Sequence, residues 1–218
     1  MKYILMIFIL LGTSLYGESN NQTIKHKTNS ARKLRFYNLA YPPIQKVYDE
    51  LLAQYNEVAE DIKTSRNPQK IEKLKKYYEV TTDEELLMAL KPHPKSIALA
   101  QAAMESAWAT SRFFTQANNL FGIWSTNKKE QRVSANKKRS STRTVWVRKF
   151  QDLEDSVRIY YKTIAKNKAY REFRETRYNS DDVMEMVDKL DKYSEMGKEY
   201  TKQLRNVIRH NNLTRYDQ

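Results

Sequence analysis

The sequence predicts a mainly α fold of the α+β class, in which a small β-hairpin lobe follows a central helix. Apolar residues recur at helical spacing through most of the chain, which is the pattern of amphipathic helices. One segment, residues 94–108, is small and apolar on nearly every side, so we expect a helix that the others cover. After Phe121 the apolar pattern changes to that of short strands.

The first residues predict an export signal. Lys2 gives a positive start, residues 3–11 form an unbroken apolar run, and residues 12–17 include small residues suited to cleavage. The apolar run is much shorter than the roughly 20 residues that a membrane-spanning helix needs. We therefore expect residues 1–17 to be a signal peptide, no stable membrane span after its cleavage, and an exported protein of the periplasm or cell envelope. An uncleaved short anchor is the alternative.

The chain is strongly basic. Its 39 Lys and Arg residues exceed its 26 Asp and Glu residues, which gives a net charge of +13. Removal of residues 1–17, whose one charge is Lys2, would lower this to +12. We expect an anionic partner, such as nucleic acid, anionic lipid or acidic cell-wall polymer. An exported protein rarely meets nucleic acid, so we expect no nucleic-acid partner.

Cysteine is absent from the chain and histidine is scarce. The chain has no cysteine, which excludes disulfides, thiol nucleophiles and cysteine-type zinc sites. Its three histidines, His26, His93 and His210, lie far apart in the sequence with no ligand spacing. We expect no metal, no cofactor and no histidine-dependent triad.

The N-terminal part of the mature chain predicts a tether and then helices. Residues 18–35 are rich in Ser, Thr, Asn and Lys, which predicts a flexible tether. Pro42 and Pro43 are expected to stop any preceding segment, so that the first helix covers residues 44–62. We expect residues 36–90 to form an N-terminal helical segment that packs on a catalytic domain of residues 91–218.

Two shorter helices follow within this segment. Asn67 and Pro68 have the chemistry of a helix cap and first position, and a helical pattern extends to Tyr78. Thr82 with Glu85 three residues later predicts a capping box for a helix that extends to about residue 90.

The central helix carries one acid at its end. Pro94 is suited to its first turn, and Glu105 falls in its last turn near Trp108. Desolvation and the negative end of the helix dipole both favour the protonated carboxyl, as a general acid requires. Trp108, three residues on, would shield the carboxyl from water. The alternatives are a solvated Glu105 at the helix rim and plain core packing of Trp108.

A β lobe and further helices complete the chain. Residues 122–125 and 143–150 predict two strands joined by a basic stretch, which is either a solvated loop or a contact for anionic polymer. The basic residues of this stretch include Lys128, Lys129, Lys137, Lys138 and Arg139. The next helix is expected to begin at Asp152 or Asp155. Three more helices are expected to cover residues 169–178, 183–190 and about 198–210.

A helix that ends in Glu and precedes an aromatic residue and a β lobe is also the order of parts in lysozyme-like folds. Two stretches carry a closer resemblance: residues 102–111, Ala-Ala-Met-Glu-Ser-Ala-Trp-Ala-Thr-Ser, and residues 118–122, Asn-Asn-Leu-Phe-Gly. They resemble the Glu-Ser-Gly-Trp-Gly-x-Ser and Asn-Asn-Leu-Phe-Gly signatures of the family 73 endo-β-N-acetylglucosaminidases, and among these the Bax-like branch. The resemblance extends from about residue 36 to residue 213, and its later pieces are Phe150 with Ser156-Val157-Arg158-x-Tyr160, Ala169-Tyr170-x-x-Phe173-Arg174 and Tyr193-Ser194-x-x-Gly197-x-x-Tyr200.

The resemblance implies a lysozyme-like helical domain that hydrolyses the β-1,4 bond after N-acetylglucosamine in peptidoglycan glycan strands, acting as a monomer. It implies that Glu105 is the proton donor and that Tyr193 orients the sugar or stabilises the transition state, although Tyr193 also fits an aromatic residue that begins a helix. Phe121 equally fits the core. The residues that it places at the substrate are Ser106, Trp108, Asn119, Phe121 and Trp124.

The chain departs from the family pattern at two places. Ala107 and Ala109 stand where glycines are usual, so the turn after Glu105 must accept two methyl groups, which we expect it to do. Between residues 122 and 150 the one acidic residue is Glu130, in a lysine-rich setting. Either Glu130 supplies the second carboxylate, or the acetamido group of the substrate assists, as in known exceptions to the two-acid scheme.

Two other functions fit the same sequence. A lytic transglycosylase also relies on one Glu after a helix, but such enzymes normally continue into a Gly-Leu-Met-Gln-type segment that this chain lacks. A non-catalytic protein that binds peptidoglycan through its positive charge is the second alternative. A nucleic-acid binder would require that residues 1–17 are not an export signal.

Overall fold

A computed structural model describes residues 20–135 and 145–218, with side chains from residue 28 onward. The predicted signal peptide of residues 1–17 lies outside the described residues. So do Lys137, Lys138 and Arg139 of the predicted basic stretch.

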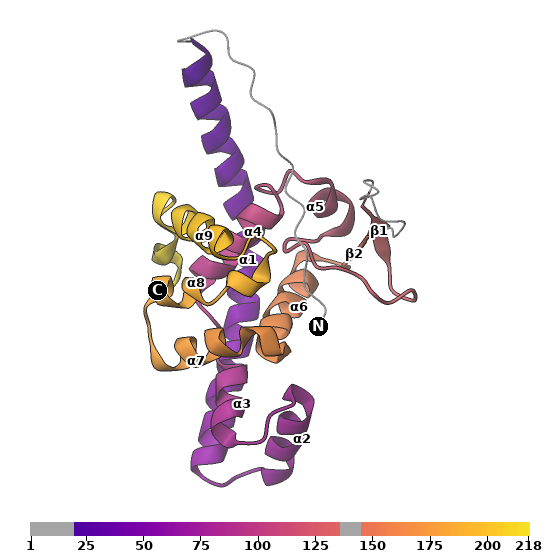
Figure 1. Cartoon of the computed structure of the whole chain (residues 1–218), viewed down its shortest axis with the longest axis vertical. Coiled ribbons are helices and arrows are strands. Elements are labelled where there is room, and N and C mark those ends of the chain that lie inside the picture. The colour runs from indigo at the N-terminus through magenta and orange to yellow at the C-terminus, as the bar shows by residue number, and fades with distance from the viewer. Residues whose placement is uncertain (1–19, 136–144) are drawn as a thin grey trace.

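The longest element is α1 (Asn20–Lys63), which runs along the long axis of the molecule (Figure 1). This corrects two sequence predictions. Residues 20–35 are helical where the sequence predicts an irregular tether, and the helix continues through Pro42 and Pro43, which were expected to precede its start. A proline in a helix interior costs about 3 kcal/mol, so a compensating interaction is needed.

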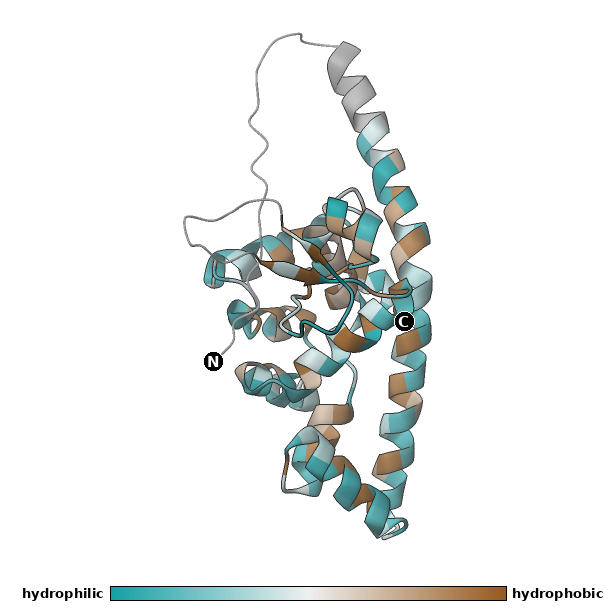
Figure 2. Cartoon of the chain, turned by 90° about the vertical axis from the view of Figure 1, so that its right-hand side faces the viewer, coloured by the Kyte–Doolittle hydropathy of each residue, from teal (hydrophilic) through white to brown (hydrophobic). Residues whose placement is uncertain are grey.

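The compensation comes from the buried face of α1. Phe36, Ile44 and Val47 are fully buried in the main core, and Ala40 lies on the same face between them. Burial of each large apolar side chain contributes about 1.5–3 kcal/mol, so the three together are comparable with the cost of the two prolines. Figure 2 shows apolar and polar residues alternating along α1, as a helix with one buried face requires.

Two short helices lie at one end of the molecule: α2 (Pro68–Tyr78) and α3 (Asp83–Leu90) (Figure 1). The predicted capping box is confirmed, because the backbone N–H of Glu85 donates to the Thr82 hydroxyl at 3.0 Å and that of Thr82 donates to the Glu85 carboxylate at 3.2 Å. Asn67 occupies the predicted cap position of α2, but its side chain makes no cap hydrogen bond. That side chain instead donates to Asp61 of α1, and Pro68 is the first residue of α2, as predicted.

The central helix, α4 (Lys95–Glu105), is the core of the fold. Nine consecutive residues, 95–103, are buried, so the helix has no solvated face. Its alanines let α1, α9 and the C-terminal turn approach it. This confirms the prediction of a covered helix, and it also brings the one acid of that helix, Glu105, to its C-terminal end.

Further helices follow the β lobe, and the last of them packs against α4. The predicted start of α6 at Asp152 is confirmed, since the carboxylate of Asp152 accepts a hydrogen bond from the backbone N–H of Asp155 at 2.8 Å. Short 3₁₀ turns lie at residues 168–170, 191–193 and 213–216. The helices are α6 (Leu153–Lys166), α7 (Arg171–Asn179), α8 (Val183–Asp188) and α9 (Lys198–His210).

The β lobe is a small antiparallel hairpin of β1 (Arg132–Ser134) and β2 (Trp146–Arg148), with Val133 opposite Val147. The predicted second strand contains β2. The predicted first strand, residues 122–125, is wrong: it contributes one isolated bridge, from Trp124 to Val147. A short helix that the sequence analysis did not identify, α5 (Arg112–Ala117), connects α4 to this lobe.

The observed arrangement confirms the predicted mainly α fold with a β hairpin after the central helix. Within residues 20–135 and 145–218, the structure contains no helix that combines the length and the apolar character required to cross a bilayer.

Candidate active site

Glu105 is the last residue of α4 and is partly buried. Its Oε1 accepts a hydrogen bond from the Tyr200 hydroxyl at 3.3 Å. Desolvation by the surrounding protein raises the pKa of Glu105 well above its usual range, and the Tyr200 hydrogen bond opposes this effect more weakly. Burial therefore favours the protonated carboxyl, which is the form that a general acid requires.

The turn after Glu105 is left-handed. Ala107, Trp108 and Ala109 have φ values of 51°, 59° and 59°, a region that suits glycine and costs other residues energy. The buried Ser106 hydroxyl donates to the carbonyl of Ala102 at 2.6 Å and accepts from the backbone N–H of Ala109 at 2.9 Å. The turn accepts the two alanines, and these contacts assign the Ser106 side chain to holding the turn.

Trp108 does not extend the face of α4 on which Glu105 lies. Because the helix ends at Glu105 and the backbone reverses, helical spacing no longer applies three residues later. The indole packs edge-on against Phe36 and Tyr37 of α1, with ring centroids 5.3 and 6.0 Å apart, and the Lys33 ammonium lies 5.0 Å from its centroid. The contacts of Trp108 are thus those of the core-packing alternative. The predicted shielding assumed that Trp108 lies on the same side of the helix as Glu105, and this assumption is wrong because the helix ends at Glu105.

The loop of residues 118–123 passes directly beside the carboxyl. At Gly122, with φ of +63°, an added Cβ would lie 3.3 Å from Oε2 of Glu105. The buried side chain of Asn119 fixes this loop through hydrogen bonds. Its amide N–H groups donate to the carbonyls of Ile123 and Arg148 at 2.9 and 2.8 Å, and its Oδ1 accepts from the backbone N–H of Ile123 at 3.0 Å. The side chain of Asn119 is thus engaged within the protein, and it shapes the site through the loop.

Two of the predicted aromatic site residues differ in exposure. Phe121 is fully buried and stacks on Tyr160 with centroids 3.8 Å apart, so it belongs to the core. Trp124 is partly exposed, on the loop that leads from Gly122 to the β lobe. Of the two, Trp124 retains an aromatic surface that a ligand can reach.

Tyr200 donates the hydrogen bond to Glu105, and the predicted site residue Tyr193 lies next to Tyr200. The hydroxyl of Tyr193 is buried and donates to the backbone carbonyl of Phe121 at 3.2 Å, while its ring stacks on that of Tyr200 with centroids 5.5 Å apart. Burial raises the pKa of both phenols well above the usual value, so both stay protonated and donate. The sequence carried a signal for Tyr200, because it closes the Tyr193-Ser194-x-x-Gly197-x-x-Tyr200 pattern.

Glu130 is partly buried on the β lobe. Its carboxylate pairs with Arg148, with Nε and Oε2 3.5 Å apart. Among the described residues, no carboxylate perturbs the pKa of Glu105, whereas a second acid at close range would raise it. The structure therefore does not bring Glu105 and Glu130 together as an interacting pair. Also within the described ranges, no three His, Asp or Glu side chains cluster as metal ligands.

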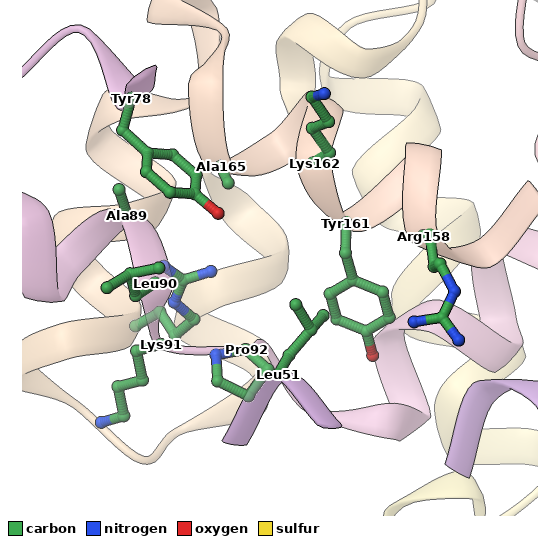
Figure 3. Close-up of a pocket in the computed structure, with 11 residues that line it drawn as sticks. Leu51, Tyr78, Ala89, Leu90, Lys91, Pro92, Arg158, Tyr161, Lys162 and Ala165 are labelled. Carbon is green, nitrogen blue, oxygen red and sulfur yellow. The ribbon is translucent and has the colours of Figure 1, made fainter. Parts of the chain in front are cut away.

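A cavity of about 180 Å³ lies away from Glu105 (Figure 3). It is lined by residues of α1, α2, α3, α6 and α7 and of the loop after α3, and none of the predicted site residues lines it. Its lining residues are Leu51, Tyr78, Ala89, Leu90, Lys91, Pro92, Arg158, Tyr161, Lys162, Ala165 and Arg177.

Comparison with known proteins gives one family match. The family described as mannosyl-glycoprotein endo-beta-N-acetylglucosaminidase matches residues 84–213. A search of curated proteins found no significant match. Residues 84–213 contain Glu105, the left-handed turn, the loop of residues 118–123 and Tyr200.

Two solved structures are similar. The catalytic domain of the autolysin Auto from Listeria monocytogenes is 18% identical with a TM-score of 0.52, and the alignment covers 94% of this chain and 100% of that chain. An N-acetylmuramoyl-L-alanine amidase from Staphylococcus aureus is 17% identical with a TM-score of 0.46, over 81% of this chain and 44% of that chain. The first similarity agrees with the predicted lysozyme-like helical domain.

Proposed function

We propose, from the premise that the chain belongs to the glucosaminidase family, that it hydrolyses the β-1,4 bond after N-acetylglucosamine in the glycan strands of peptidoglycan. The single observation that carries the proposal is the state of Glu105. It is the only acid on a helix buried over residues 95–103, its carboxyl is desolvated, and a neutral tyrosine donates to one of its oxygens. The net charge of +13 supports an anionic polymer such as the cell wall as the substrate.

In this mechanism Glu105 acts as the general acid. Its protonated carboxyl gives a proton to the glycosidic oxygen as the bond to the anomeric carbon breaks, and the resulting carboxylate is stabilised by the Tyr200 hydroxyl. The loop at Gly122 approaches this carboxyl without a side chain, and an added Cβ would lie 3.3 Å from Oε2. Trp124 is the proposed aromatic platform for a sugar ring.

The second catalytic group is proposed to belong to the substrate. Glu130 is paired with Arg148, and separating this pair would leave each charge without its partner. The acetamido oxygen of N-acetylglucosamine is always present beside the anomeric carbon, and some glycosidases use it in place of a second carboxylate. We therefore assign Glu130 to the stability of the β lobe, and Tyr193 to support of the Phe121 backbone behind the site.

The test compares two matched substitutions on purified peptidoglycan sacculi. Glu105→Gln should retain binding to sacculi and lower turnover by at least about 10²-fold, the lower end of general-acid contributions. Glu130→Gln removes the other candidate acid with the same chemical change, and it should lower turnover by less than about tenfold. Unchanged hydrolysis by Glu105→Gln would refute the assignment, and equal losses in both variants would support a two-acid mechanism.

Product analysis separates the proposal from its alternatives. A hydrolase leaves a reducing N-acetylglucosamine end, whereas a lytic transglycosylase leaves an anhydro sugar, and mass spectrometry distinguishes the two. Binding to sacculi without any cleavage would identify a non-catalytic wall-binding protein.

The site of action is proposed to be the cell envelope, reached by export. The basis is the sequence of residues 1–17 together with a substrate that lies outside the cytoplasm. N-terminal sequencing of the protein recovered from the producing cells tests this, because cleavage after residue 17 would leave Glu18 as the first residue.

A further inference from the structure

A chain of hydrogen bonds leads from Glu105 into the core. The Tyr200 hydroxyl donates to Oε1 of Glu105 at 3.3 Å, and Nε2 of Gln101 donates to the Tyr200 hydroxyl at 2.7 Å. The Tyr160 hydroxyl donates to Oε1 of Gln101 at 2.5 Å, and Nε2 of His93 lies 2.8 Å from the Tyr160 hydroxyl. All four residues behind Glu105 are buried, so they depend on one another for their hydrogen bonds.

The hydrogen bonds of this chain all run in one direction from donor to acceptor, and the ring nitrogen of His93 that carries the proton determines that direction. Each tyrosine hydroxyl has one proton, and the Gln101 amide presents an oxygen on one side and an N–H group on the other, so all the bonds must point the same way. Nδ1 of His93 is buried without a hydrogen-bond partner among the described residues. A proton on Nδ1 would leave a buried N–H unpaired, whereas a proton on Nε2 is donated to Tyr160.

With that proton on Nε2, the remaining bonds follow. Tyr160 accepts from His93 and must donate to Oε1 of Gln101, which turns the amide N–H toward Tyr200. Tyr200 accepts there and is left to donate its own proton to Glu105. His93 therefore determines where the Tyr200 proton points, although it lies far from the carboxyl along the chain of bonds.

The surroundings of His93 keep its ring neutral. Burial lowers the pKa of His93 well below its usual value, and the positive charge of Arg177 acts in the same direction. The rings of Tyr160, Tyr161 and Phe173 cover it, and Tyr161 also donates to its backbone carbonyl at 3.3 Å. Within the described residues no carboxylate is paired with it, so the ring does not gain a second proton that would reverse the chain.

We propose that His93, Tyr160 and Gln101 are positioning residues that hold the Tyr200 hydroxyl on Oε1 of Glu105 and so leave Oε2 as the oxygen that carries the transferred proton. The inference rests on the proposed function, and it specifies the acid step. The proton leaves Oε2 for the leaving oxygen, which also takes the electron pair of the breaking glycosidic C–O bond, and the acetamido oxygen bonds to the anomeric carbon to give an oxazolinium ion. Water then bonds to the anomeric carbon, the bond to the acetamido oxygen breaks, and the Glu105 carboxylate accepts the proton of the water. Oε2 is the oxygen that lies beside Gly122, where an added Cβ would be 3.3 Å away.

The test removes one link of the chain. Tyr160→Phe deletes the hydroxyl and keeps the ring that stacks on Phe121. Gln101 is then free to turn its amide, Tyr200 is no longer directed to Glu105, and the carboxylate loses its donor, so the pKa of Glu105 should rise. A general acid works while protonated, so the alkaline limb of the kcat/KM profile on sacculi should move up by about half to one pH unit, and kcat should fall about tenfold.

Tyr170→Phe is the matched control. Tyr170 is a buried tyrosine whose phenol interacts with the Glu105 charge, but its hydroxyl is not a member of the chain. Loss of its hydroxyl should leave the alkaline limb in place. If both variants shift the limb equally, or if Tyr160→Phe leaves it unmoved, the positioning role is refuted, because a general packing defect would explain the data.

Two spectroscopic measurements on the full chain do not depend on turnover. ¹⁵N NMR of His93 should show a protonated Nε2 and a bare Nδ1 from pH 5 to 8, and a protonated Nδ1 would overturn the proposal. ¹³C NMR of the Glu105 carboxyl, assigned with Glu105→Gln, should show a higher pKa in Tyr160→Phe than in the wild type. If the wild type fails to hydrolyse sacculi, the proposed function is refuted. The two NMR measurements still decide whether the hydrogen-bond chain directs the Tyr200 hydroxyl toward Glu105.

Discussion

Replacing Ala107 by glycine should stabilise the protein, although alanine is usually the more stabilising of the two residues. Ala107 has φ of 51° and its side chain is exposed, so the substitution removes backbone strain and almost no packing. The left-handed conformation costs a non-glycine residue roughly 1–2 kcal/mol. Glycine has more conformational freedom than alanine in the unfolded chain, which reduces the gain in the free energy of unfolding by about 0.5–1 kcal/mol. The net gain should be about 0.5–1 kcal/mol.

Urea denaturation followed by circular dichroism measures this gain, and thermal unfolding should show a rise of about 1–4 °C for a chain of this size. Ala53 provides the control, because it is exposed like Ala107 but lies within α1, where the backbone is right-handed. Ala53→Gly should destabilise by about 1 kcal/mol. If Ala107→Gly destabilises by as much as Ala53→Gly, the left-handed turn after Glu105 is refuted.

Two further predictions concern the carboxyl itself. Gly122→Ala should lower hydrolysis of sacculi at least about tenfold, because alanine at φ of +63° is strained by roughly 1–2 kcal/mol and its Cβ would lie 3.3 Å from Oε2 of Glu105. Gly197→Ala, at φ of +56° and ψ of −125° with open space around the added Cβ, should cost at least as much stability and leave hydrolysis unchanged, so equal activity losses would contradict the account. Glu105→Gln should become progressively more stable than the wild type as pH rises from 4 to 8. The folded-state pKa of Glu105 is raised, so its contribution to stability is full below the unfolded pKa and is lost as pH rises through the folded pKa. A stability difference between the two proteins that stays constant across this pH range in urea titrations would contradict it.

Several features were predictable because they depend on residues close together in the chain. The Thr82 and Glu85 capping box uses groups three residues apart, and it appears in the structure as predicted. The covered helix that ends in Glu105 follows from a run of small apolar residues, which would be unfavourable in water on any face. The family resemblance rests on the same local stretches, and the family match covers them.

Other predictions failed because distant residues outweigh local preference. Pro42 and Pro43 locally disfavour a helix, but the helix persists because its face on both sides of them is buried against the rest of the fold. Helical spacing placed Trp108 beside Glu105, but the left-handed turn sends the indole to Phe36 on α1. Neither outcome can be derived from the residues next to the prolines or the tryptophan.

By itself, the sequence determined the acid and its helix: Glu105 is the one charge at the end of a segment that must be buried. Only the tertiary structure decided which groups surround that acid. It placed the Tyr200 hydroxyl on Glu105, brought Gly122 to the carboxyl and aligned His93, Tyr160 and Gln101 behind it. The reason is physical: hydrogen bonds between buried side chains depend on where whole helices pack, and these residues are separated by up to about a hundred positions in the chain.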